Sequence, residues 1–377
     1  MNRRQLLAAA TAAALPLPAL AASRTQWKVR GSEGFDALCF LAPLSGKPLY
    51  TPYYKAELEA FRPSFPAAAQ AALDRAQAAA DAKSTLLAPS LCSLLSAAPD
   101  ATLADVTRAV RDAETLVLPG YKASAYWDPE SWDWLLAIRP DLLVVLDGLK
   151  TGGFAPFRQQ LIGAKLEPRI AALSAKLAGL DVIAEDERLL GRRLDPGLEV
   201  ILLWFSKPHG TRILGQRFLS HVDYPDNITV RIAAHEVMHP PFPMDGPTAT
   251  AALAVLNADP LMARVLKEHD PNFGYNSMEG ILNEDTVQAL DQIVAERLGV
   301  AAPAAARWKS ADGGMHILAA GLYGLLKADG YDQRGGNIEQ WMAEAVKAGK
   351  LRPESLHTAA AGVLGVPADQ LWGPKSA

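Results

Sequence analysis

The segment His235-Glu236-Val237-Met238-His239-Pro240-Pro241 constrains the fold more than any other part of the chain. Residues four apart lie on one face of a helix, so His235 and His239 point in the same direction. Two consecutive prolines end a helix, because proline lacks a backbone N–H and disfavours helical geometry in the preceding residue. The sequence therefore predicts a helix that begins near Ile228, with Asp226-Asn227 as its N-cap, and stops just past the second histidine.

Two imidazoles one helical turn apart can bind a single metal ion, and the adjacent carboxylate of Glu236 can deprotonate a water molecule beside it. Zn²⁺ suits neutral imidazole ligands and lowers the pKa of a bound water to about 7. The motif therefore predicts a catalytic zinc site with Glu236 as general base. The competing interpretation is that both histidines lie on a helix surface or accept hydrogen bonds in a core, and that the chain binds no metal.

The remaining pattern predicts a mostly helical α+β fold with a small sheet. Residues 198–205 form a short β-favouring run bounded by proline and glycine, and residues 211–222 read as a weaker second strand with an internal glycine. Apolar residues recur at helical spacing in most of the remaining chain. The predicted helices cover residues 66–82, 103–116, 131–137 with 141–150, 156–180, 277–298, 315–326, 337–347 and 353–362.

Roughly residues 200–298 resemble the zincin metallopeptidases, and specifically the glutamate-zincins. The resemblance consists of a strand pair, a helix with this histidine motif and a glutamate on a later helix. The metzincin subclass would need glycine and histidine where this chain has Phe242 and Asp245. The resemblance implies a zincin-like catalytic core, flanked by helical regions, that hydrolyses a peptide or protein substrate. It also implies that the third zinc ligand comes from a later helix.

The pair Asn283-Glu284 resembles the family's ligand motif, so Glu284 is the implied third zinc ligand. Glu279 and Asp285 are alternatives, because positions within one helical turn lie only a few ångströms apart. In the family, an aspartate four residues after this glutamate orients a zinc-bound histidine. Gln288 occupies that position here, so the sequence leaves open which group orients the histidine.

The family also implies a histidine or tyrosine that donates a hydrogen bond to the oxyanion of the tetrahedral intermediate. His316 follows two glycines at the start of a predicted helix, and His221 and Tyr224 shortly precede the metal-bearing helix. These three are the preferred candidates, and Tyr275 and Tyr323 are the other two. The sequence does not choose among the five.

Residues 1–22 are typical of a secretory signal peptide: two arginines, an apolar segment rich in alanine and leucine, and a small-residue cleavage site. The alternative is a membrane anchor, although Pro16 and Pro18 interrupt a segment that is already short for a span. Arg3-Arg4 is also compatible with twin-arginine export. We therefore expect a periplasmic or secreted protein with no membrane span in its mature form. Its expected regions are an N-terminal helical region (23–190), the zincin-like core (191–302) and a C-terminal helical region (303–377).

The formal net charge of -4 gives no broad basic surface, which argues against nucleic acid as a partner. The two cysteines, Cys39 and Cys92, either pair in an oxidising compartment or remain as buried thiols. Neither has a neighbouring ligand at zinc-binding spacing. The sequence thus predicts an exported zinc hydrolase that cleaves peptide bonds. The alternative is an exported zinc-binding protein that serves as a non-catalytic binding or scaffold module on the same fold.

Overall fold

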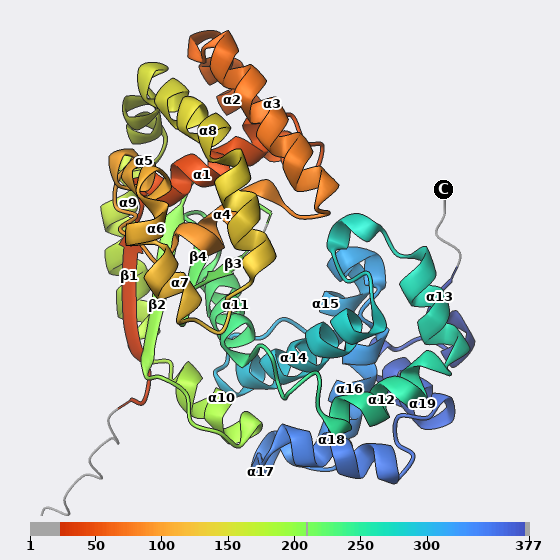
Figure 1. The fold of residues 1–377 in the computed structure, drawn as a ribbon. Coiled ribbons are helices and arrows are strands. Elements are labelled where there is room, and N and C mark those ends of the chain that lie inside the picture. The colour runs from red at the N-terminus through yellow and green to blue at the C-terminus, as the bar shows by residue number, and fades with distance from the viewer. Residues whose placement is uncertain (1–22, 209, 374–377) are drawn as a thin grey trace, which may run out of the picture.

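The computed structural model describes residues 23–208 and 210–373, so the predicted signal segment, residues 1–22, lies outside the described residues. The fold is α+β and mostly helical, as the sequence predicts. A four-stranded sheet in the order β1-β2-β4-β3 joins a group of helices from the first half of the chain to a second group that contains the histidine motif (Figure 1).

The sheet is mixed in direction. β1 pairs in parallel with β2, β2 pairs in parallel with β4, and β3 runs antiparallel to β4 at the edge. The strands span Gln26–Gly31 (β1), Gly197–Leu203 (β2), Thr211–Ile213 (β3) and Arg217–His221 (β4).

Two predictions about the sheet are wrong. Residues 211–222 form a hairpin of two strands, because Gly215 adopts a positive φ of 77° in the turn between β3 and β4. β1 was not predicted at all, since Lys28 and Arg30 make its sequence look polar. Both charged side chains pair across the sheet with Glu199 of β2, at 2.8 and 2.6 Å, so the charges are balanced only in the folded protein.

β2 lies between two hydrophobic cores. Val200 and Leu202 belong to the core of the second helix group, whereas Ile201 and Leu203 belong to the core of the first. Successive strand residues point to opposite faces of a sheet, and both faces of this strand are covered. A strand buried on both faces has a continuous apolar sequence, which explains why this strand was the easiest to predict.

The first helix group is tied to the end of β2 by a buried ion pair. Asp36 of α1 bonds Arg158 of α9 at 2.6 Å and accepts the backbone N–H groups of Trp204 and Phe205. The predicted helix over 103–116 is divided at Asp112, whereas 131–150 lies within one continuous helix. The group comprises α1 (Glu33–Leu44), α2 (Lys55–Phe61), α3 (Ala67–Ala82), α4 (Leu87–Leu95), α5 (Leu103–Arg111), α6 (Ala113–Leu116), α7 (Leu118–Lys122), α8 (Pro129–Thr151) and α9 (Phe154–Leu177).

The second helix group surrounds α14, which is buried on almost every side from Glu284 to Ala295. Ser277 caps this helix by accepting the N–H of Gly280. The group comprises α10 (Val182–Leu190), α11 (Asp226–Met238), α12 (Pro247–Asn257), α13 (Pro260–Glu268), α14 (Met278–Arg297), α15 (Ala304–Ser310), α16 (Ile317–Ala328), α17 (Tyr331–Arg334), α18 (Ile338–Lys347) and α19 (Pro353–Leu364).

Helix α11 carries the histidine motif and packs against α14, α10 and β4. Its N-cap is Pro225 and not Asp226-Asn227 as predicted, because the Asp226 carboxylate pairs with Arg169 at 2.5 Å. The helix ends at Met238, one residue earlier than predicted. His239 has extended backbone angles and lies just outside the helix.

Among the described residues, no single helix has the length and apolar composition needed to cross a membrane. Helices α12 and α13 reach that length and apolar composition only as a pair, and a 90° bend separates them.

Candidate metal centre

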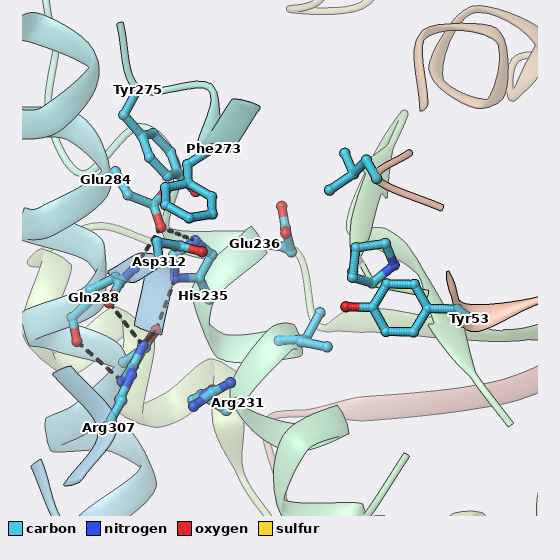
Figure 2. Close-up of a pocket in the computed structure, with 15 residues that line it drawn as sticks. Tyr53, Arg231, His235, Glu236, Phe273, Tyr275, Glu284, Gln288, Arg307 and Asp312 are labelled. Atoms are coloured by element: carbon cyan, nitrogen blue, oxygen red, sulfur yellow. Dashed lines mark hydrogen bonds and ion pairs between the residues drawn. The ribbon is translucent and has the colours of Figure 1, made fainter. Parts of the chain in front are cut away.

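Three side chains that are distant in sequence converge at one point between α11 and α14. The Nε2 atoms of His235 and His239 lie 3.0 Å apart. Each Nε2 lies 3.4 Å from a different carboxylate oxygen of Glu284. The structure therefore brings together the three metal ligands that the sequence proposed, with their ligand atoms within 4.8 Å of one another. Figure 2 shows two of them, His235 and Glu284.

The donor set fits a zinc ion. Tetrahedral zinc with bonds of about 2.0–2.2 Å holds its ligand atoms about 3.3–3.5 Å apart, close to the observed spacing. The Nδ1 atom of His235 lies 2.8 Å from an oxygen of Asp291, and that of His239 lies 3.2 Å from Oδ1 of Asn283. These acceptors take the N–H groups at Nδ1, so both Nε2 atoms face the same point. Burial lowers the pKa of His235, but Glu284 and Asp291 outweigh burial and raise it, which means that this point attracts positive charge. A bound metal ion would supply that charge in place of a proton.

The two alternative third ligands face elsewhere. Glu279 is exposed in the first turn of α14. Asp285 is buried about 100° around the helix from Glu284, where it accepts a hydrogen bond from Nδ1 of His316 at 2.6 Å and another from the backbone N–H of Ala319. Only Glu284 of the three candidates approaches the histidine pair.

Asp291 orients His235, and sequence reasoning missed it. It lies seven residues after Glu284, two turns along the same face of α14, whereas the resemblance directed attention to position 288. Both oxygens of Asp291 are also bonded by the guanidinium of Arg307 from α15. Burial raises the pKa of Asp291, but Arg307 and His235 outweigh burial and lower it, so the carboxylate is held ionised.

Gln288 stands where the resemblance implies an aspartate, and it contacts Glu284 and no ligand histidine. Its Oε1 accepts the indole N–H of Trp308 at 2.9 Å, which directs its amide nitrogen to Oε1 of Glu284, also at 2.9 Å. Burial raises the pKa of Glu284, but His235 and His239 outweigh burial and lower it well below the usual value. Glu284 is therefore ionised, as a metal ligand must be.

Two arginines bind the carbonyl groups at the end of α11. Arg212 of β3 donates to the carbonyl oxygens of Glu236 and His239, at 2.5 and 2.8 Å. Arg192 donates to the carbonyl of Pro240 at 2.6 Å. The last carbonyls of any helix lack partners within the helix, and cations are favourable near them. The Pro240-Pro241 break is the sequence signal that could have suggested a search for such donors.

The metal centre opens into a cavity of about 370 Å³ that is lined by both His235 and Glu236 (Figure 2). Tyr53, Tyr275 and Asp312 contribute to other parts of its wall. Burial raises the pKa of Glu236, whereas the two histidines lower it. A carboxylate with a raised pKa beside a metal centre is suited to accept and return a proton.

Of the five oxyanion candidates, only Tyr275 lines the cavity. Its hydroxyl bonds Glu284, and burial together with the charge of Glu284 raises its pKa, so it stays protonated and can donate. His316 is fully buried behind the wall, where its Nε2 lies 2.8 Å from an oxygen of Asp312. Burial disfavours its charge, but Asp285 and Asp312 raise the pKa of His316 to about 10.

The other three candidates are not among the residues that line this cavity. His221 is buried at the end of β4, where its Nδ1 accepts the backbone N–H of Asp223 at 3.0 Å. The hydroxyl of Tyr224 donates to the carbonyl of Pro208 at 3.0 Å. Tyr323 donates to Glu296 on a later part of α14. The structure thus does not bring His221 and Tyr224, which the sequence preferred, into contact with the metal ligands.

No protein-family model, curated protein or solved structure matches this chain. The likeness to the glutamate-zincins rests on the motif residues and the geometry described above.

Proposed function

We propose that this chain is a zinc-dependent hydrolase that cleaves peptide bonds. The convergence of His235, His239 and Glu284 beside Glu236 in one cavity is the observation that supports this proposal. When bound, zinc would polarise the scissile carbonyl and make a water molecule acidic enough to be deprotonated near neutral pH.

Glu236 is the proposed general base and then the general acid. Its carboxylate accepts a proton from the attacking water as the water oxygen bonds to the carbonyl carbon. The same carboxyl group then gives that proton to the leaving amine nitrogen as the C–N bond breaks. Tyr275, which lines the cavity, is the proposed donor to the oxygen that gains negative charge, and its O–H would turn from Glu284 to that oxygen.

The chain's own residues hold this arrangement before a substrate arrives. Asp291 and Asn283 orient the two histidines, and Gln288 orients Glu284. Contacts of this kind around a metal centre typically change metal affinity or activity by about 10–100-fold when they are removed.

The test combines metal analysis with one substitution. Purified protein should carry about one equivalent of zinc and cleave members of a diverse peptide library in a chelator-sensitive manner. Glu236→Gln should bind zinc equally well and lose at least about 10²-fold in turnover, because the amide cannot accept the proton. Full activity of the variant would contradict the mechanism. Stoichiometric zinc without any cleavage would support the non-catalytic alternative, and absence of zinc would refute both.

The N-terminal segment also indicates where the protein acts. We infer export to the periplasm or outside the cell from residues 1–22, whose pattern is typical of a signal peptide. Fractionation of cells that express the full chain, with N-terminal sequencing of the mature protein, tests this inference.

A further inference from the structure

Arg231 is a charged residue in the wall of the cavity that the proposed mechanism does not use. It lies one turn before His235 on α11, and the two side chains emerge on the same face of the helix. No hydrogen bond or ion pair joins its guanidinium to another residue in the part of the chain that the structure describes. Figure 2 shows it below His235, without any of the drawn interactions.

The carboxylates nearest to Arg231 already have other partners. Asp291 is bonded by His235 and by both terminal nitrogens of Arg307. Asp312 is bonded by His316 at 2.8 Å. Burial and the charge of Arg307 lower the pKa of Arg231 by more than the charges of Asp291 and Asp312 raise it. An unpaired charge in such a place is costly, and an incoming anion would remove that cost.

We propose that Arg231 binds a carboxylate group of the substrate. This inference rests on the proposed function, because it assumes that a peptide occupies the cavity beside the metal centre. A guanidinium presents paired N–H donors that match the two oxygens of a carboxylate, and such bidentate bonds are stronger than neutral ones. Arg231 therefore selects acidic substrates over neutral ones.

The position of Arg231 limits where the carboxylate can lie in the substrate. One helical turn, about 5.4 Å, separates Arg231 from the first histidine ligand. An extended peptide advances about 3.3–3.6 Å per residue. The carboxylate thus belongs about one to three residues from the scissile bond, and it is either the C-terminus of a short peptide or an acidic side chain.

Binding of three inhibitor-like probes to the zinc-loaded protein tests the proposal without requiring turnover. All three carry a metal-binding hydroxamate. The first is a hydroxamate-capped Ala-Ala with a free C-terminal carboxylate, the second is its C-terminal amide, and the third is the Ala-Asp amide. Calorimetry should show at least tenfold tighter binding of the first or the third than of the neutral second. The probe that is preferred identifies the source of the carboxylate.

Substitutions then assign the preference to Arg231. Arg231→Gln should remove the preference for a carboxylate, and Arg231→Lys should keep part of it. Arg192 is an exposed arginine near the end of the same helix, and Arg192→Gln should keep the whole preference. Zinc content reports whether each variant retains the folded metal centre. Equal affinity of the parent for all three probes, or a preference that survives in Arg231→Gln, overturns the proposal. Absence of zinc in the parent refutes the proposed function as well, whereas stoichiometric zinc without a carboxylate preference refutes only this inference.

Discussion

Asp291 is the carboxylate that contacts His235 in the candidate metal centre. It fixes the ring of His235 and is itself held by Arg307. We expect Asp291→Asn to weaken zinc binding by about 10–100-fold, because an amide accepts the ring N–H less strongly than a carboxylate. Competition against a chromophoric chelator measures this change.

Asp285→Asn is the matched control, since Asp285 is an equally buried carboxylate on α14 that faces α16. It should lower stability with a smaller change in zinc affinity. Unchanged zinc affinity in Asp291→Asn would contradict the role given to Asp291.

His221 makes stability depend on pH. Burial, followed by the charge of Lys207, lowers the pKa of His221 to about 4 from its usual 6.5. His221 therefore gains a proton near pH 6.5 in the unfolded chain, but only near pH 4 in the folded protein. The free energy of unfolding consequently falls as the pH drops from about 6.5 to about 4. The loss amounts to about 3 kcal/mol at about 1.4 kcal/mol per pH unit.

Urea unfolding of the parent and of His221→Gln at several pH values between 4 and 7 tests this dependence. The stability of the variant should fall less steeply with decreasing pH. Equal slopes would show that His221 is not the group responsible.

At the residue scale, the sequence predicted the three side chains that converge but not the groups that orient them. His235, Glu236 and His239 follow from local helix geometry, which a sequence displays directly. Asp291 and Arg307 act through contacts between α14, α11 and α15, and no local pattern distinguishes Asp291 from the other carboxylates of α14. Sequence reasoning assigned no role to Gln288, because its bond to Glu284 depends on Trp308, twenty residues further along the chain.

At the scale of elements, the C-terminal end of α11 depends on strand β3. Arg212→Gln should cost about 1.5–3 kcal/mol in the free energy of unfolding, because it removes charged donors from the Glu236 and His239 carbonyls. It should also weaken zinc binding, since His239 lies beyond the helix and relies on this contact. Chemical denaturation and zinc titration measure the two effects.

Arg192→Gln is the control for Arg212, because Arg192 is exposed and bonds only the following carbonyl, that of Pro240. Arg192→Gln should change the free energy of unfolding and the zinc affinity less than Arg212→Gln does. A larger effect of Arg192→Gln would contradict the assignment.

Helices α1 and α4 bring Cys39 and Cys92 together, with their sulfur atoms 3.8 Å apart and both side chains buried. In an oxidising compartment, we expect a thiol–disulfide oxidant to accept two electrons and two protons from the pair as the S–S bond forms. The closed loop would stabilise the protein by about 4 kcal/mol. Thiol titration of the denatured protein, before and after reduction, detects the bond. Two free thiols after exposure to the oxidant would contradict this expectation.

Prediction of the elements succeeded where the pattern is local and failed where pairing is distant. Asn337 caps α18 as predicted, by accepting the N–H of Gln340. By contrast, β1 forms only because β2 lies beside it, and its charges gave no strand signal. The predicted N-cap at Asp226-Asn227 failed because Arg169, on α9, holds the Asp226 carboxylate.

At the scale of the whole molecule, all three metal ligands belong to the second helix group. Removal of zinc should therefore destabilise that group first. At a free zinc concentration one hundred times the dissociation constant, the ion adds about 2.7 kcal/mol, or about 3–4 °C in Tm for a chain of this length. Calorimetric scans with and without chelator measure this shift.

Glu236→Gln should show the same thermal shift as the parent, because Glu236 is not a ligand. A Tm that is insensitive to chelator in both proteins would contradict metal binding at this site.

The arrangement of the whole chain was the least predictable property. The three regions that the sequence delimits, 23–190, 191–302 and 303–377, all contribute to the sheet or to the cavity. β1 and Tyr53 come from the first region, and Arg307 and Asp312 come from the last. Hydrophobic periodicity shows which face of an element is buried, but it carries no information about which partner covers that face.

The pairing of β1 with β2 has a consequence for biosynthesis. β1 ends at Gly31, whereas its only neighbouring strand begins at Gly197. At roughly 5–20 residues per second, the ribosome completes β2 about ten to thirty seconds after β1. During that interval β1 has no strand to pair with, so a nascent chain of this protein is exposed to chaperones and proteases until the middle of the sequence has been translated.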